Sequence, residues 1–208
     1  MASIYDLKPK FQNLLRPLCK RAARAGITAN QVTLIAFGLS FAHGAANIAT
    51  HGARWVLFTL PVILFLRMAL NAIDGMLARE HGQETRLGAL LNELTDVLSD
   101  AALYLPFAFL AGLQPGLIVL IVFFGAVAEM AGIIGIQIGS VRRYDGPFGK
   151  SDRAFFFGAL SLVLAFEVEP GQWSTVLLAF AMALSFATIV HRGRNALRDV
   201  RTQESSHA

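Results

Sequence analysis

Stretches of apolar residues long enough to cross a lipid bilayer recur six times along this 208-residue chain. A helix needs about 20 such residues to cross roughly 30 Å of hydrocarbon, where its own backbone hydrogen bonds replace those to water. The sequence therefore predicts an all-α integral membrane protein with six transmembrane helices. The predicted spans are Val32–Ile48, Trp55–Ile73, Ala89–Ala111, Leu117–Ile138, Phe155–Phe166 and Trp173–Val190.

The composition supports a membrane protein and excludes several other classes. The chain is 55% hydrophobic and 15% charged, and a soluble domain of this size could not bury that much apolar surface. A single cysteine, Cys19, excludes an intrachain disulfide framework. The first thirty residues lack the compact apolar core of a cleavable signal. The net charge of +4 comes from basic residues between the apolar spans, which favours anionic lipid headgroups over nucleic acid as partners.

The lysine and arginine residues lie mainly on one side of the predicted spans. Sixteen of the eighteen lie at the N-terminus, in the loops after the second and fourth spans, or at the C-terminal end. Arg54 alone lies on the other side, and Arg67 lies within a span. Because cytoplasmic loops carry the excess of such residues, both termini are predicted to be cytoplasmic, in a multi-pass protein of the inner (cytoplasmic) membrane.

The N-terminal segment has the pattern of an amphipathic helix. Apolar residues from Ile4 to Ala22 recur at three- and four-residue steps, with most basic residues on the opposite face. This predicts a helix in the cytoplasmic interface, bent or delimited by Pro9 and Pro17; a disordered basic arm is the alternative. The chain is interpreted as one membrane domain, with an interfacial helix in 1–27, a six-helix bundle in 28–192 and a cytoplasmic tail in 193–208 that ends in disorder.

Polar side chains interrupt the second and third spans near the cytoplasmic turn that they share. Ionisable groups near hydrocarbon are costly and usually functional. If the two spans pair antiparallel and turn near Gly82, a rise of about 1.5 Å per residue assigns equal depths to positions at equal distances from the turn. Spacings of three or four residues then put them in one stripe on each helix. The predicted layers are Asp74 with Asn92, Asn71 with Asp96, and Arg67 with Asp100.

These layers predict different roles. Arg67 and Asp100, the deepest pair, are expected to form a salt bridge, because either alone would be an uncompensated charge. The upper layers offer carboxylate and amide oxygens that suit Mg²⁺, Mn²⁺ or Ca²⁺. With Arg67 assigned to Asp100, Arg79 is the only cation in the stripe left for Asp74 and Asp96, and it supplies a fork for phosphate oxygens. The cluster therefore predicts a metal-assisted site for a phosphate-bearing lipid or nucleotide. Polar contacts that only hold helices together are the alternative.

The same residues resemble the signature of the class-I CDP-alcohol phosphotransferase (CDP-alcohol phosphatidyltransferase) family, D-x2-D-G-x2-A-R-x8-G-x3-D-x3-D. Every spacing is kept and six of the eight identities match, with asparagine at the first and third aspartate positions. The segment TANQVT, residues 28–33, is similar to the family's T-P-N-x-x-T entry to the first span, with Ala29 in place of proline. The signature positions are Asn71, Asp74, Gly75, Ala78, Arg79, Gly88, Asn92 and Asp96.

The resemblance implies a transfer reaction of phospholipid biosynthesis at the cytoplasmic interface. An acceptor hydroxyl attacks the β-phosphorus of a CDP-linked donor such as CDP-diacylglycerol, and CMP leaves. Carried over by position, Asp74 and Asp96 are metal ligands, and Asp96 is also the candidate base. Asn71 and Asn92 still offer carbonyl oxygens, but two negative charges are lost, so that one or two Mg²⁺ or Mn²⁺ ions remain open. The implied CDP-binding residues are Asn30, Thr33, Gly75, Ala78, Arg79 and Gly88.

The loop Arg142–Ala154 is the second candidate site. Lys150 and Arg153 open the fifth span, where helix N-terminal amides also favour anions. We expect Lys150, Arg153 and Arg143 to bind a phosphate or polar head of a small alcohol or lipid acceptor. A loop whose charge only fixes topology is the alternative. Glu129, a lone carboxylate in the fourth span, is interpreted as protonated or hydrogen-bonded rather than catalytic.

Three functions from different classes follow from these features. A membrane phosphotransferase leads. A non-catalytic relative that keeps the CDP-lipid site is supported by the two asparagines. A small cation-coupled transporter is disfavoured, because no second polar cluster lies near the bilayer midplane. Gly135 and Gly139 are spaced for close helix packing, within the chain or in a homodimer.

Overall fold

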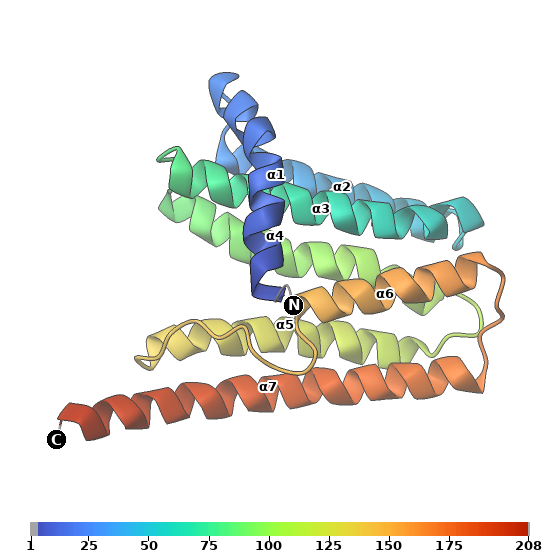
Figure 1. The fold of residues 1–208 in the computed structure, drawn as a ribbon. Helices are drawn as coiled ribbons and strands as arrows, with labels where there is room; N and C mark the ends of the chain where they lie inside the picture. Colours follow the sequence, from blue (N-terminus) through green and yellow to red (C-terminus); the bar gives the residue numbers. More distant parts are fainter. Residues whose placement is uncertain (1–3, 208) are drawn as a thin grey trace. The chain divides into compact units, whose positions relative to one another are not determined.

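The computed structural model describes residues 4–207 as helices joined by short turns and loops (Figure 1). The chain divides into two compact units, which we describe separately. The first comprises residues up to Ala45 together with Thr59–Leu103, and the second comprises Ala46–Phe58 and the residues from Tyr104 onward. The elements are α1 (Ile4–Arg24), α2 (Ala29–Ala49), α3 (Arg54–Glu80), α4 (Arg86–Tyr104), the 3₁₀ helix η1 (Leu105–Phe109), α5 (Pro115–Gln137), α6 (Lys150–Ala165) and α7 (Gln172–His207).

Four of these helices are long and apolar enough to cross a membrane. They are α2, α3, α5 and the part of α7 from Gln172 to Gln203. Helix α4 carries Glu93, Asp96 and Asp100, and α6 has only 16 residues. The structure therefore supports an all-helical membrane protein with four candidate spans among the described residues, and the count of six stays a prediction.

The first unit contains α1 and most of α2, α3 and α4. Helix α1 runs at a steep angle to α2 and α3 (Figure 1) and packs on both through the fully buried Cys19, which joins Val32 of α2 and Met76 and Leu77 of α3 in one apolar cluster. Arg16 of α1 also pairs with Glu80 at 2.9 Å. These contacts hold α1 against the ends of the helices that carry the first candidate site.

The second unit is built around α5 and α7, which pack along one another. The ring of Tyr104 stacks on that of Phe157 of α6 with centroids 4.3 Å apart. A Cβ added at Gly135 of α5 would lie 3.1 Å from the Val141 carbonyl oxygen and 3.6 Å from the Cβ of Ala196. Gly135 therefore serves packing within this chain, and a homodimer stays a prediction.

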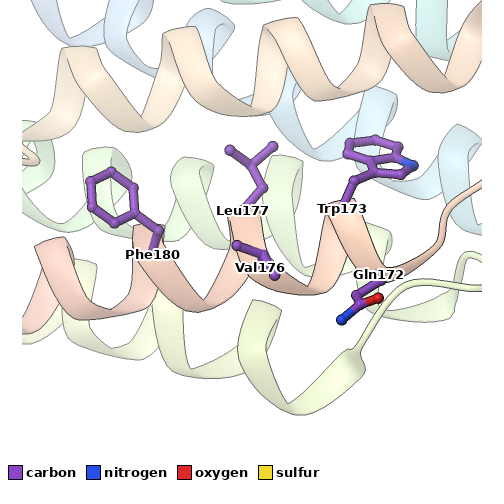
Figure 2. Close-up of a pocket in the computed structure, with 5 residues that line it drawn as sticks. All are labelled: Gln172, Trp173, Val176, Leu177 and Phe180. Atoms are coloured by element: carbon purple, nitrogen blue, oxygen red, sulfur yellow. The ribbon is translucent and has the colours of Figure 1, made fainter.

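An open groove of about 590 Å³ lies on the first turns of α7 (Figure 2). Val176, Leu177 and Phe180 make it apolar, while Trp173 donates a hydrogen bond from its indole nitrogen to the Glu169 carbonyl at 3.0 Å. A tryptophan at the end of an apolar helix is typical of a membrane–water interface. The groove contains none of the predicted site residues, and it suits contact with lipid.

Two boundaries differ from the prediction. The third predicted span continues to Ala111, but α4 ends at Tyr104 and gives way to η1, because Pro106 has no N–H to donate and disfavours helical geometry before it. The predicted disordered end is also wrong up to His207, where α7 ends. Before this segment, α7 packs within the second unit through the buried Ala196 and through Asp199, which accepts a hydrogen bond from Ser140.

Candidate active site

The antiparallel pair α3 and α4 brings two of the three predicted polar layers together. Arg67 donates to Asp100 Oδ1 at 2.6 Å, so the predicted salt bridge is present, and both side chains are buried. One layer nearer the turn, Asn71 Nδ2 donates to Asp96 Oδ1 at 3.1 Å. Asn92 lies half-buried one turn before Asp96, and its pairing with Asp74 stays a prediction.

Arg67 reaches further than the layer argument predicts. Its second terminal nitrogen donates to the Asp96 carbonyl oxygen at 2.9 Å and lies 3.4 Å from Asp96 Oδ1. The expectation that Arg79 is the only cation in the stripe for these carboxylates is therefore wrong. A long arginine side chain can pair with residues on two successive turns of the facing helix, because its guanidinium donates in several directions.

The start of α2 supplies the third wall of the site. Thr28 and Gln31 form a capping box, with Thr28 Oγ1 accepting from the Gln31 amide at 3.3 Å and Gln31 Oε1 accepting from the Thr28 amide at 2.9 Å. Gln83, from the turn after α3, accepts from the Ala29 amide at 2.7 Å. This anchoring places Thr33, whose hydroxyl donates to Asp74 Oδ2 at 2.8 Å.

Two glycines allow close approach at the same end of this unit. A Cβ on Gly88 would lie 2.7 Å from Asn30 Oδ1, so the Asn30 side chain fits over α4 only because this residue is glycine. A Cβ on Gly75 would lie 3.1 Å from a terminal nitrogen of Arg79, whose side chain is exposed. Ala78 packs against the Cys19 cluster. The first unit thus brings Thr33 to Asp74, Asn30 to Gly88 and Arg79 to Gly75, while their role in binding CDP stays a prediction.

The donor set of this cluster fits a hard divalent cation. Asp74 and Asp96 supply carboxylate oxygens, and Asn71 and Thr33 offer neutral oxygens, the ligand types that Mg²⁺ and Mn²⁺ prefer. Among the residues that the structure describes, no group of three His, Cys, Asp or Glu side chains could hold a metal ion. Two carboxylates balance the charge of one divalent ion, and the number of ions stays a prediction.

The predicted acceptor loop forms an ion-pair network in the second unit. Arg143 contacts Asp145 at 2.8 Å and Asp199 of α7 at 2.7 Å. Burial alone would raise the pKa of the Asp145 carboxyl, but hydrogen bonds from Arg143 and from the Asn195 amide outweigh it and lower that pKa below its usual value. Asp145 is therefore ionised at neutral pH.

A second part of this network lies deeper. Glu129 of α5 contacts Arg153 of α6 at 3.2 Å and Arg192 of α7 at 3.3 Å. The sequence predicts that Glu129 is protonated or hydrogen-bonded rather than catalytic. It does make a hydrogen bond inside the bundle, but it is not a lone carboxylate, because two arginines pair with it. Lys150 is half-buried at the first residue of α6.

Sequence reasoning missed Arg192, which it treated only as part of the inside-positive charge. Arg192 is 1% exposed and donates to backbone oxygens of Ala128, Tyr144 and Asp145. The available signal was the polar stripe along α7 that continues the apolar face at three- and four-residue steps. Its members are Thr188, Arg192, Asn195 and Asp199.

Comparisons with known proteins identify the family. The model of the CDP-alcohol phosphatidyltransferase family matches residues 26–187. The chain is 46% identical to the inner membrane protein YnbA of Escherichia coli (strain K12) over 196 aligned residues, and the alignment covers 94% of this chain and 96% of that protein. It is also 34% identical to the phosphatidylinositol phosphate synthase of Mycolicibacterium smegmatis over 105 aligned residues, which cover 50% of this chain and 46% of that protein.

Solved structures show the same fold. The Mycobacterium tuberculosis phosphatidylinositol phosphate synthase with CDP-DAG bound matches with a TM-score of 0.73 at 20% identity, over 86% of this chain and 92% of that one. The structure of the same synthase in complex with manganese and citrate also matches with a TM-score of 0.73, over 87% of this chain and 88% of that one. Family match, full-length relative and shared fold together show that this chain belongs to the CDP-alcohol phosphatidyltransferase family.

Proposed function

We propose that this protein transfers a substituted phosphate group, of the phosphatidyl type, from CDP-diacylglycerol or a similar CDP-alcohol to the hydroxyl of an acceptor, and releases CMP. The family match over residues 26–187 carries this proposal. A synthase of the same fold holds CDP-DAG, and the relative that covers nearly the whole chain is named an inner membrane protein. Both observations agree with a lipid-linked donor at a membrane.

The residues of the first unit divide the work of the transfer. Arg79, whose side chain lies over Gly75, and Asn30, whose side chain lies over Gly88, would hold the diphosphate and cytidine part of the donor. The acceptor oxygen forms a bond to the β-phosphorus while the bond from that phosphorus to the bridging oxygen breaks. The bridging oxygen leaves with CMP. Asp96 would take the proton of the attacking hydroxyl, since a carboxylate positioned by Arg67 and Asn71 keeps one orientation.

A bound divalent ion would supply positive charge for this chemistry. Asp74 and Asp96 would hold Mg²⁺ or Mn²⁺, and the bound ion would offset negative charge on the diphosphate and the departing CMP. The synthase of the same fold was solved with manganese. Arg67 shares Asp96 Oδ1 with Asn71, so the carboxylate charge available to ions is small. We propose one ion at the site before the donor binds, with the donor diphosphate completing its shell.

The acceptor side of the reaction is proposed for the second unit. Lys150, Arg153 and Arg143 would orient the polar head of the acceptor through hydrogen bonds. Arg153 is 2% exposed and is held by Glu129, which gives it a fixed direction. The alternative, in which this charge only sets topology, predicts that none of these three side chains affects the Michaelis constant for the acceptor.

CMP release from CDP-diacylglycerol by the purified full chain in nanodiscs, with Mn²⁺ and a panel of alcohols, tests the proposal. Asp74→Asn and Asp96→Asn should each lower the rate by more than about 100-fold, because even outer-shell partners of a metal are worth about 10–100-fold. The matched control is Glu84→Gln in the exposed turn after α3, which should keep the rate. Full activity of both aspartate variants would refute the assignment.

A non-catalytic CDP-lipid-binding relative is the second candidate. Asn71 and Arg67 both occupy Asp96 Oδ1, which would weaken Asp96 as a base and as a ligand. Under this function the chain binds CDP-diacylglycerol with unchanged affinity in Asp96→Asn and releases no CMP with any acceptor.

Titration of Mn²⁺ with and without the donor counts the bound ions. Two tight sites in the donor-free protein would contradict the single-ion proposal.

A further inference from the structure

Glu129 lies where an anionic group of a ligand would be expected, between two buried arginines. Its Oε1 is 3.2 Å from Arg153 Nη2 and its Oε2 is 3.3 Å from Arg192 Nη1. The side chains of Arg153, Arg192 and Glu129 are 3%, 2% and 11% exposed. The chain therefore supplies its own carboxylate to both guanidinium groups, one oxygen to each.

Arg192 has little capacity left for a ligand. Its Nε donates to the Asp145 carbonyl at 3.0 Å, Nη1 to the Ala128 carbonyl at 2.6 Å, and Nη2 to the Tyr144 carbonyl at 3.3 Å. A guanidinium has five N–H groups, and these three carbonyls together with Glu129 account for most of them. Arg192 therefore fixes the backbone of the loop.

The remaining charges of the network are also balanced within the chain. Arg143 pairs with both Asp145 and Asp199. Three arginines thus face three carboxylates: Arg143, Arg153 and Arg192 with Glu129, Asp145 and Asp199. Outside this network, Arg142 lies over the Tyr144 ring at 4.6 Å, and Asp152, two residues after Lys150, accepts from the Gly149 amide at 2.8 Å.

From this geometry we propose that Glu129 is a specificity-determining residue that restricts the acceptor to an alcohol without a phosphate group. The inference rests on the proposed function and on the proposed acceptor role of Arg153 and Arg143. A phosphate monoester carries a charge of about −1.5 to −2 at neutral pH. It would have to approach the Glu129 carboxylate or displace it from both arginines, and a buried carboxylate without its partners is strongly unfavourable.

An uncharged polyol meets no such barrier. Its hydroxyl groups can donate to the outer lone pairs of Glu129 and Asp145 and accept from Arg153 and Lys150, because a hydroxyl is both donor and acceptor. The relatives named phosphatidylinositol phosphate synthases make a product whose head group bears a phosphate. We therefore expect this chain to differ from them in the acceptor that it takes.

Matched acceptor pairs test the proposal in the full chain with CDP-diacylglycerol and Mn²⁺. Inositol is compared with inositol phosphate, and glycerol with glycerol phosphate, by kcat/KM for CMP release. The wild type should favour the member without phosphate by at least about tenfold, since like-charge contact costs several kcal/mol. Glu129→Gln, which keeps the shape but removes the charge, should shift the ratio toward the phosphate ester by at least about tenfold. A wild type that favours the phosphate esters would overturn the proposal.

A binding measurement separates this proposal from the reaction itself. Inorganic phosphate, added without divalent ions, should raise the thermal unfolding midpoint of Glu129→Gln but not that of the wild type. Glu167→Gln removes the same charge from the exposed pair with Arg54 and serves as the matched control. Equal phosphate stabilisation of all three proteins would overturn the role of Glu129. If no acceptor releases CMP, the proposed function fails while this measurement still decides the inference.

Should Glu129→Gln fail to fold, two results still decide the question. The wild-type preference within each acceptor pair is measured without any variant. Glu129→Asp retains the carboxylate and should retain the preference for acceptors without phosphate, although its shorter side chain weakens one of the two contacts. A Glu129→Asp protein that gains the phosphate esters as acceptors would contradict a charge-based exclusion.

Discussion

Arg67 connects two residues with different roles. It neutralises Asp100 at 2.6 Å and also holds Asp96 through the backbone carbonyl at 2.9 Å and the carboxylate at 3.4 Å. At the residue scale, a cation inside an apolar helix is tolerated because it is fully paired, and its pairing orients the carboxylate proposed to take part in transfer.

We predict that Asp100→Asn destabilises the protein by about 3–5 kcal/mol, because it leaves Arg67 buried beside only one carboxylate. The double variant Arg67→Met with Asp100→Leu should lose less, since no unpaired charge remains. Reversible unfolding in mixed micelles measures both. Glu167→Gln, in the exposed pair with Arg54, is the control and should cost no more than about 1 kcal/mol. Additive single and double losses would show that the pair does not act as a unit.

Gly88 offers a second test at the residue scale. A Cβ there would lie 2.7 Å from Asn30 Oδ1 and 3.0 Å from Thr85 Oγ1. Gly88→Ala should therefore displace Asn30 and raise the Michaelis constant for the CDP donor by about tenfold, the cost of about 1.4 kcal/mol of lost binding. Gly38→Ala is the control, because nothing lies within 4 Å of its added Cβ. An unchanged constant in Gly88→Ala would remove Asn30 from the donor site.

The residue layers were predictable to the extent that helix geometry determines them. Equal distance from one turn gives equal depth on two antiparallel helices, which is why Asn71 meets Asp96 and Arg67 meets Asp100. The second contact of Arg67 and the network of Arg192 were not predictable in this way. They depend on the reach of long side chains and on partners that are distant in sequence, 29 residues away for Arg67 and 47 to 64 residues away for Arg192. No local periodicity gives a signal for such contacts.

At the scale of elements, α1 shows how tertiary packing overrides a local rule. The periodic pattern predicts a helix, with Pro9 and Pro17 as points where it bends or ends, yet one helix runs through both from Ile4 to Arg24. Its apolar face is fixed by Cys19 against Val32 and Leu77, which offsets the hydrogen bonds that the prolines cannot make. The position of α1 in the membrane interface stays a prediction.

The single cysteine reports on this docking. Burial raises the pKa of the Cys19 thiol, so that at pH 7 to 8 the reactive thiolate is scarcer than for an exposed cysteine. Cys19 should react with a small maleimide at least about 100-fold more slowly in the folded protein than in denaturant, where burial no longer protects the thiol. Mass spectrometry over time measures both rates. Rapid labelling of the folded chain would show that α1 does not pack as described.

For the whole molecule, charge asymmetry predicts which side of the membrane each loop occupies. In a Cys19→Ser background, Gln114→Cys, in the turn before α5, should be labelled on intact cells by a membrane-impermeant maleimide. His81→Cys, in the exposed turn after α3, should be labelled only after the membrane is opened. The reverse pattern would invert the orientation and put the proposed active site on the outer side.

The hydrogen bond from the Asn71 amide to Asp96 has a consequence for how the bundle assembles. Two facing carboxylates at 3.1 Å would repel one another until a cation arrived, whereas an amide and a carboxylate attract. At this contact, helices α3 and α4 can therefore pair without a bound cation. We expect the docking of the two helices on one another to be insensitive to divalent cations.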